Sequence, residues 1–175
     1  MSNLKDSPKF AVHNDYYTPK SAWENVQHLI GKDKTIYEAF MFNSKSKSPD
    51  YFNELGYKVI YDREVDFLDD EKRLTGYDII VSNPPFETKL KQDILRKLVE
   101  IDKPFLIIMN SMNTFSKYMR SIFKGHMGDL QLITPDGKIQ FDKLEDGVIK
   151  KTKNCSFYCV YVCYKMNLDS GELWL

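Results

Sequence analysis

The sequence predicts an α/β domain with a mostly parallel sheet and an antiparallel strand pair at the carboxy-terminal end. Apolar runs of strand length alternate with helical patterns along residues 20–123, which favours parallel strands joined by helices. Residues 79–81 are uniformly apolar, as in a strand that is buried on both faces. The last third of the chain has short apolar segments joined by turn residues, which favours antiparallel strands.

Each element rests on a local pattern. Trp23, Val26 and Ile30 are spaced as on one face of a helix, which Thr18 or Ser21 can cap. The expected helices cover residues 20–30, 48–55, 87–101 and 114–123. The expected strands cover residues 35–40, 57–61, 77–82, 104–109, 130–134, 138–141 and 156–164.

The composition indicates a soluble protein with a single core. Of the 175 residues, 42% are apolar and 29% are charged, and 25 basic side chains balance 25 acidic ones. We expect a flexible lead-in over residues 1–14 and a single domain over residues 15–168, without a separate target-recognition domain. A net charge of zero counts against a chain that grips nucleic acid unaided.

The spacing of the cysteines and the absence of a long apolar run indicate where in the cell the protein is located. Cys155, Cys159 and Cys163 are four residues apart, which places them on one strand face as core thiols rather than in a disulfide framework or a zinc site. No apolar run approaches the roughly 20 residues of a membrane span. We therefore expect a cytoplasmic protein in a reducing compartment, without a membrane.

The histidines lack metal-ligand spacing, so no metal is expected.

The motif Asn83-Pro84-Pro85-Phe86 follows the expected buried strand over residues 77–82. Two consecutive prolines remove two backbone donors and fix two φ angles, which stiffens the loop. Such a loop can hold the Asn83 oxygen and a proline carbonyl as acceptors for the two hydrogens of an amine, while Phe86 offers a face for stacking. The alternative interpretation is a tight turn with Phe86 in the core.

Acidic residues end the two preceding strands, namely Glu38 and Asp62. Ligands of open α/β sheets bind beyond the carboxyl ends of the strands. A carboxylate after the second strand can accept hydrogen bonds from the two hydroxyls of a ribose.

These motifs resemble the S-adenosyl-L-methionine-dependent amino-methyltransferases, specifically the N6-adenine branch. Residues 83–86 match the family's Asp/Asn/Ser-Pro-Pro-aromatic signature. Tyr17-Thr18-Pro19 resembles the segment that contacts the methionine part of the cofactor. Asp66-Phe67 resembles the pair that binds the cofactor's adenine. The resemblance spans roughly residues 15–165 and implies a Rossmann-like class I methyltransferase fold.

The resemblance implies a set of site residues and an activity. The catalytic residues would be Asn83, Pro84, Pro85 and Phe86. The cofactor-binding residues would be Tyr17, Thr18, Pro19, Glu38, Phe40, Asp62, Asp66 and Phe67. The implied reaction is methylation of the exocyclic amine of adenine in DNA, with RNA as the other candidate, by base flipping and direct methyl transfer.

Two departures from the family leave alternatives open. Residues 39–46 contain no glycine where the family carries Phe-x-Gly-x-Gly, so a non-catalytic or partner-dependent binding module is one alternative. Methylation of a protein glutamine at N5 is a second, because the same motif serves that amide. The chain also lacks an obvious target-reading region, which a homo-oligomer or a separate recognition subunit would supply.

The best local basic segment is the charged loop expected over residues 142–154. Lys150, Lys151 and Lys153 could contact phosphates there, and Phe157 could supply a second aromatic ring against the target base. The competing interpretations are a solvated loop and a core phenylalanine.

Overall fold

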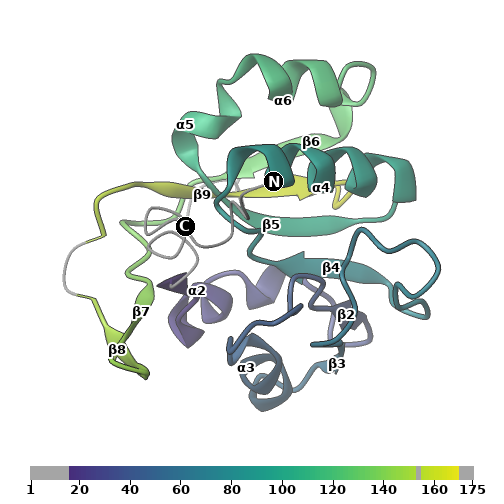
Figure 1. Ribbon diagram of the computed structural model, residues 1–175. Coiled ribbons are helices and arrows are strands. Elements are labelled where there is room, and N and C mark those ends of the chain that lie inside the picture. Colours follow the sequence, from purple (N-terminus) through teal and green to yellow (C-terminus); the bar gives the residue numbers. More distant parts are fainter. Residues whose placement is uncertain (1–15, 153–154, 170–175) are drawn as a thin grey trace, which may run out of the picture.

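A six-stranded sheet, with helices on both faces, dominates the computed structural model, which describes residues 16–152 and 155–169 (Figure 1). The expected lead-in over residues 1–14 and the predicted phosphate contact Lys153 lie outside the described residues. The strands are β1 (Tyr16–Tyr17), β2 (Thr35–Tyr37), β3 (Lys58–Ile60), β4 (Ile79–Ser82), β5 (Phe105–Asn110), β6 (Leu130–Ile133), β7 (Asp142–Glu145), β8 (Val148–Lys151) and β9 (Cys159–Tyr164). The helices are α2 (Lys20–Glu24), α3 (Ser48–Glu54), α4 (Thr88–Ile101), α5 (Ser111–Thr114) and α6 (Lys117–Ile122), with 3₁₀ turns η2 (Gln27–Leu29) and η3 (Met127–Asp129).

The sheet has the strand order β3-β2-β4-β5-β9-β6. Strands β3, β2, β4 and β5 run parallel to one another, and β9 runs antiparallel to both β5 and β6. This arrangement confirms the predicted Rossmann-like fold, with its mostly parallel sheet and antiparallel carboxy-terminal strand pair. The chain order reverses at β2, which is flanked by β3 on one side and β4 on the other. Ligands of such folds bind at this switch point, beyond the carboxyl ends of the strands.

Alternate residues of each buried strand enter two separate cores. In β4, Ile79 and Val81 pack on one face of the sheet while Ile80 packs on the other. Helices α2 and α3 lie on the first face, and α4 and α6 lie on the second (Figure 1). The cysteines Cys155, Cys159 and Cys163 are buried free thiols of the first core, as predicted, but only Cys159 and Cys163 lie on one strand, because Cys155 precedes β9.

Two expected helices are shorter and divided. The helix expected over residues 20–30 ends at Glu24 and continues as the 3₁₀ turn η2. The helix expected over residues 114–123 is replaced by α5 and α6, because Ser116 caps a new helix by accepting a hydrogen bond from the Met119 N–H. Ser111 and Thr114, the ends of α5, lie at the carboxyl edge of the sheet just after β5.

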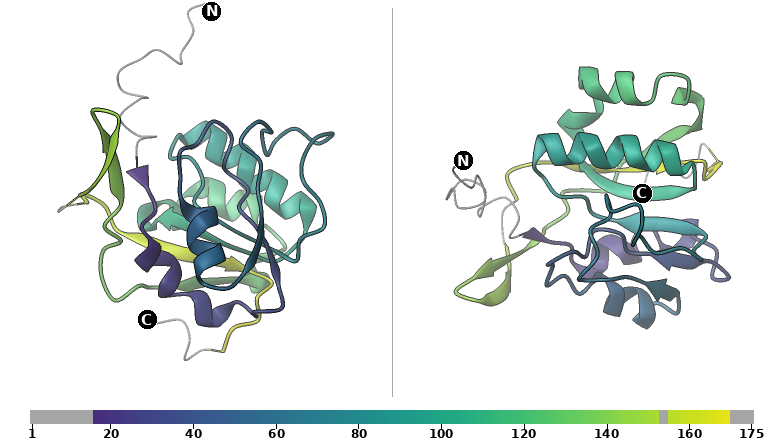
Figure 2. Two further views of the ribbon diagram at one scale, coloured as in Figure 1. Left: turned by 90° about the horizontal axis from the view of Figure 1, so that it is seen from below. Right: turned by 45° about the vertical axis from the view of Figure 1, so that its right-hand side comes forward.

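The expectation for residues 138–154 is wrong in two respects. No strand forms over residues 138–141, and the expected charged loop contains the antiparallel hairpin β7–β8. The short strand β1 pairs with β7, so the three form a second sheet in the order β1-β7-β8. The physical reason is cross-strand pairing around the turn at Asp146 and Gly147, both of which adopt positive φ. The hairpin projects away from the main sheet in both views of Figure 2.

Across residues 16–152 and 155–169, no helix is long and apolar enough to cross a membrane.

Candidate active site

A pocket of about 520 Å³ lies at the switch point of the sheet. Its walls come from segments that are distant in sequence but share the carboxyl edge: residues 16–18 before α2, residues 38–48 after β2, residues 66–67 after β3, residues 83–86 after β4, and two side chains of α4. A volume of this size is typical of sites for small organic ligands, which span about 300–1,000 Å³.

Asn83 stands at the head of the loop that follows β4 and lines the pocket. Its side-chain Nδ2 donates a hydrogen bond to Thr18 Oγ1 over 3.1 Å. Its Oδ1 is buried and accepts no hydrogen bond from any described residue. Because a buried acceptor without a donor is costly, this oxygen is a site for a donor from a ligand.

The Asn83 loop is anchored at its far end by helix α4. The Glu87 carboxylate caps this helix, accepting from the backbone N–H groups of Lys89 (3.0 Å) and Leu90 (2.7 Å). Lys91 is buried, and its Nζ donates to the Phe86 carbonyl over 3.3 Å. Burial lowers the pKa of Lys91. The loop is therefore held at both ends, in addition to the stiffness of Pro84 and Pro85.

Glu38, the residue after β2, is almost fully buried in the wall of the pocket. Burial raises the pKa of its carboxyl group to about 8, although hydrogen bonds from Ser82, Phe40 and Ser48 and the charge of Arg63 favour the ionised form. The Ser82 hydroxyl donates to Glu38 Oε1, which ties the ends of β2 and β4 together.

Phe40 and Phe67 form an aromatic wall. Their rings meet edge to face with centroids 5.1 Å apart, and Phe67 is buried against Tyr37. Asp66 precedes this wall and lines the pocket, with its Oδ1 accepting from the Leu68 N–H over 2.9 Å. An aromatic face beside a carboxylate suits a flat ring that carries an amine.

A cluster of four aromatic rings, Tyr16, Phe86, Phe141 and Phe157, surrounds the Phe86 end of the pocket. The Phe86 ring lies 5.4 Å from Phe157, 6.0 Å from Phe141 and 6.2 Å from Tyr16, each in edge-to-face geometry. Phe86 is half-buried and also lines the pocket. Its ring therefore packs against the core and also contributes to the pocket surface. The predicted pair of Phe86 and Phe157 is thus brought together.

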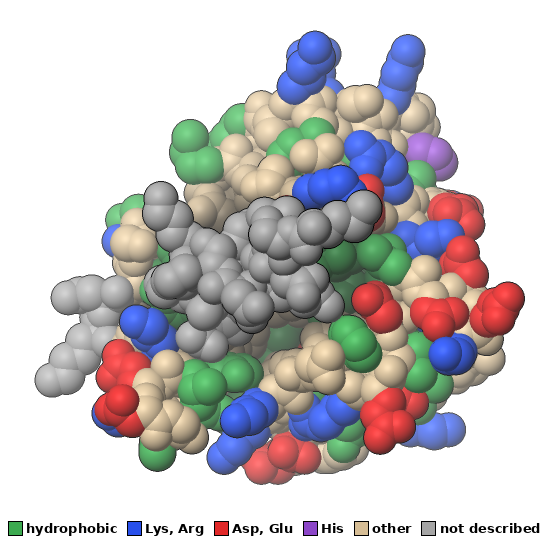
Figure 3. Space-filling model, viewed as in Figure 1, with side chains coloured by type: hydrophobic (Ala, Val, Ile, Leu, Met, Phe, Trp, Pro, Cys, Tyr) green, Lys and Arg blue, Asp and Glu red, His purple; other side chains and the backbone are tan. Residues whose placement is uncertain are grey.

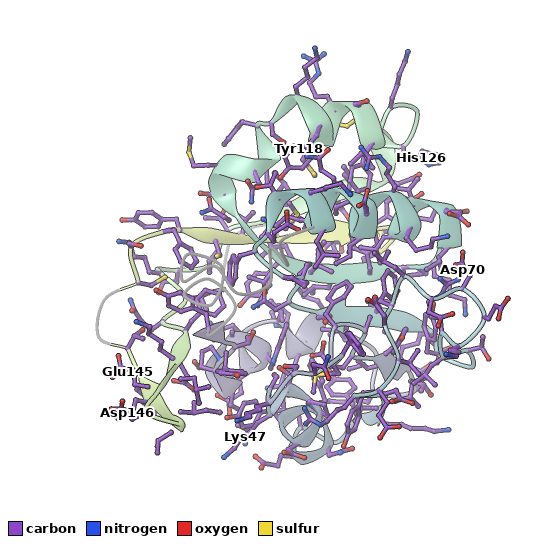
Figure 4. The ribbon with its side chains drawn as sticks, in the orientation of Figure 1. Lys47, Asp70, Tyr118, His126, Glu145 and Asp146 are labelled. Atoms are coloured by element: carbon purple, nitrogen blue, oxygen red, sulfur yellow. The ribbon has the colours of Figure 1, made fainter. Side chains whose placement is uncertain are left out.

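The predicted phosphate contacts Lys150 and Lys151 lie on β8 of the projecting hairpin. Lys150 Nζ lies 3.7 Å from Glu145 and 3.9 Å from Asp146, the acids at the hairpin tip (Figure 4). On the coloured part of the face in Figure 3, basic and acidic side chains are interspersed. Electrostatic attraction for phosphate at this hairpin is therefore partly cancelled.

The structure brings the predicted catalytic and cofactor-binding residues together in the pocket, except two; Phe157 also does not line it. Pro19 precedes α2 outside the pocket lining. Asp62 also lies outside it, and its Oδ1 accepts from the Glu64 N–H over 2.7 Å. The role at a ribose that its place after the second strand predicted for Asp62 therefore lacks geometric support. Thr18, considered above as a helix cap, instead orients Asn83.

Sequence reasoning missed the serines of the first loop. Ser44, Ser46 and Ser48 all line the pocket. Ser48 Oγ accepts from the indole Nε1 of Trp23 over 3.0 Å, and the Ser46 hydroxyl donates to Ser48 Oγ over 3.1 Å. The alternation of serines in residues 44–48 was the available signal, since serine hydroxyls bond neighbouring backbone groups in turns. No group of three or more potential metal ligands occurs among the residues described.

Comparison with known proteins gives distant structural likenesses only. No protein-family model matches the chain, and no curated protein matches it. A 16S rRNA methyltransferase from T. thermophilus, in complex with AdoMet and guanosine, is 16% identical with a TM-score of 0.46, over 94% of this chain and 45% of that one. The chain thus spans less than half the length of that protein.

Two further solved structures have lower scores. A SAM-dependent O-methyltransferase from Thermotoga maritima is 10% identical with a TM-score of 0.42, over 96% of this chain and 71% of that one. An rRNA methylase from Streptococcus thermophilus is 9% identical with a TM-score of 0.40, over 82% of this chain and 92% of that one. At these scores the likenesses add nothing to the functional argument, which rests on the geometry of the pocket.

Proposed function

We propose that the protein is an S-adenosyl-L-methionine-dependent methyltransferase that acts on the exocyclic amine of adenine, in DNA in preference to RNA. The observation that carries this proposal is Asn83 Oδ1, a buried acceptor without a donor among the described residues, at the head of a stiff loop that lines the pocket.

The residues of the pocket fit this cofactor. The aromatic wall of Phe40 and Phe67, with Asp66 beside it, suits the adenine ring and its amine. Glu38 and the loop serines provide polar groups in the interior of the pocket. When bound, the cofactor supplies an electrophilic methyl group on a sulfonium.

The chain's own residues would position the amine for direct attack. Thr18 accepts from the Asn83 amide nitrogen, which leaves the Asn83 oxygen to accept a hydrogen from the amine. The Pro84 carbonyl is the second acceptor, and the two together favour a tetrahedral nitrogen with an available lone pair. Phe86, held by its ring neighbours, offers a face to a base that has left the helix. No covalent intermediate on the protein is required.

The test is transfer of a labelled methyl group from S-adenosylmethionine to three acceptors: adenine-containing duplex DNA, RNA, and a mixture of translation factors. We expect label on DNA, recovered as N6-methyladenine after digestion and mass spectrometry. Label on RNA alone would show that the substrate is RNA and not DNA. Label on a protein glutamine would favour N5-glutamine methylation. Cofactor binding without transfer to any acceptor would contradict the enzymatic assignment and leave a binding module.

A further inference from the structure

The loop between β2 and α3 reaches the pocket without a single glycine. Asn43, Ser44 and Ser46 of this loop all line the pocket. Asn43 has a φ of 53°, in the left-handed region that glycine occupies without cost. A loop with this backbone conformation and no glycine needs outside contacts to hold its shape.

Arg63, three residues beyond the end of β3 at Ile60, supplies three such contacts. Its Nη1 donates to the Ser44 carbonyl, and its Nη2 donates to the Ser46 carbonyl over 3.0 Å. The Arg63 carbonyl in turn accepts from the Asn43 N–H over 3.0 Å. A planar guanidinium holds two acceptors at a fixed spacing, which a lysine ammonium does not.

The Arg63 guanidinium contacts the loop without lining the pocket. Arg63 is half-buried and is not part of the pocket lining, whereas all three loop residues that it contacts are. It also forms no ion pair with a carboxylate within residues 16–152 and 155–169, in contrast to Arg73 and Arg96, which pair with Asp70 and Asp93. The donors of Arg63 are thus directed to the loop backbone and not to a surface acid.

The other side of the loop is tied to the core. The Ser48 N–H donates to Ser46 Oγ over 3.2 Å, and Ser48 Oγ accepts from the buried Trp23 indole. The loop is therefore held between Arg63 on one side and Trp23 on the other. The contacts of the loop with Arg63 and with Trp23 join residues that are 17 or more positions apart in the sequence, so these contacts form only in the folded protein.

We propose that Arg63 is a positioning residue for cofactor capture: its guanidinium holds the glycine-free loop in the shape that admits S-adenosylmethionine. This rests on the proposed function. The role differs from catalysis, because Arg63 does not line the pocket and makes its hydrogen bonds with Ser44, Ser46 and Asn43.

The experiment compares Arg63→Ala and Arg63→Lys with the wild type, and uses Arg96→Ala as the matched control for loss of one arginine. Calorimetry with S-adenosylhomocysteine gives Kd, and steady-state methyl transfer gives the cofactor KM and kcat. For Arg63→Ala we expect Kd and KM to rise about tenfold or more, with kcat at saturating cofactor within about twofold of the wild type. Arg63→Lys should be intermediate, and Arg96→Ala unchanged.

Each outcome bears on a different statement. Wild-type protein that binds no cofactor would overturn the proposed function, and the role of Arg63 with it. Wild-type binding with an unchanged Kd in Arg63→Ala would overturn only the positioning role. A kcat loss without a KM change would also overturn that role. If Arg63→Ala does not fold, Arg63→Gln, which keeps two donors without the charge, replaces it with the same expected rise in KM.

Discussion

The two loops that face each other across the pocket reach rigidity by different means. The proposed catalytic loop, residues 83–86, is stiffened by its own two prolines and is anchored close by in sequence, through Glu87 and Lys91. The proposed cofactor loop, residues 39–47, has neither proline nor glycine and is held by Arg63 and Trp23 from other parts of the chain. Rigidity of the first kind can be recognised in a sequence, whereas rigidity of the second kind is apparent only in the fold.

The largest expected effect is on the catalytic loop. Asn83→Ala removes the acceptor for the amine and should lower kcat by about 10²–10³, by analogy with the loss of one preorganised hydrogen-bonding group. Because Asn83 acts on the acceptor, the Kd for S-adenosylhomocysteine should change little. Single-turnover methyl transfer measures the first quantity and calorimetry the second. Asn53→Ala, on the exposed side of α3, is the control, and an equal loss in both variants would contradict the role of Asn83.

The next effect concerns the aromatic ring of the same loop. Phe86→Ala should weaken use of nucleic acid by about tenfold or more, since stacking of a base contributes about 1–3 kcal/mol. The measurement is kcat/KM for the DNA substrate at saturating cofactor. Phe115→Ala removes a ring that is 81% exposed and lies outside the four-ring cluster, so it should be neutral. Equal losses in Phe86→Ala and Phe115→Ala would argue for a general surface effect.

A smaller effect is expected at the contact that joins the amino-terminal segment to the catalytic loop. Thr18→Val keeps the shape of the side chain but removes the acceptor for Asn83 Nδ2, so the amide is free to turn. We expect kcat to fall by about tenfold, which corresponds to one hydrogen bond to a buried group. Pre-steady-state transfer is the readout, and Thr88→Val, exposed at the start of α4, is the control. A change in cofactor affinity without a change in kcat would contradict this orienting role.

The last expected effect concerns stability rather than activity: the stability of the protein should depend on pH through Glu38. The pKa of Glu38 is raised from an ordinary value of 4.5 to about 8 by burial. The folded state therefore holds a proton that the unfolded state releases between these values. The stability from this proton is fully present below about pH 4.5 and is lost as the pH rises through about 8.

The free energy of unfolding of the wild type should thus fall relative to Glu38→Gln across that range, by at most about 1.4 kcal/mol per pH unit. Denaturant unfolding of both proteins at a series of pH values measures the difference. Parallel curves would show that Glu38 does not titrate in this way.

The difference between the loops also explains what could be predicted from the sequence. The catalytic motif, the strand that precedes it and the sheet type depend on local patterns, and the structure confirms the strand and the sheet. Arg63 carries no local signal, because its partners Ser44 and Ser46 lie 19 and 17 residues away. The β7–β8 hairpin differs, because Asp146-Gly147 is a local hairpin signal that the charges of this segment outweighed in the sequence-based prediction. Only the pairing of β7 with β1 requires the fold.

Asp62 shows the limit of an assignment from strand order. Its place after the second strand predicted a contact with a ribose, but it does not line the pocket, whereas Asp66, four residues later, does. Both carboxylates accept a hydrogen bond from the backbone N–H two residues on, so local turn chemistry does not distinguish them. The path of the loop in the fold decides which acid reaches the pocket.

A crystal structure of the protein with S-adenosylhomocysteine would test the assignment of the pocket. We expect the adenine to lie against Phe40 and Phe67 near Asp66, residues 43–46 to keep their contacts with Arg63, and the sulfur to face Asn83. A ligand bound elsewhere, or a first loop that moves away from Arg63 to admit it, would show that the pocket does not bind the cofactor in this way.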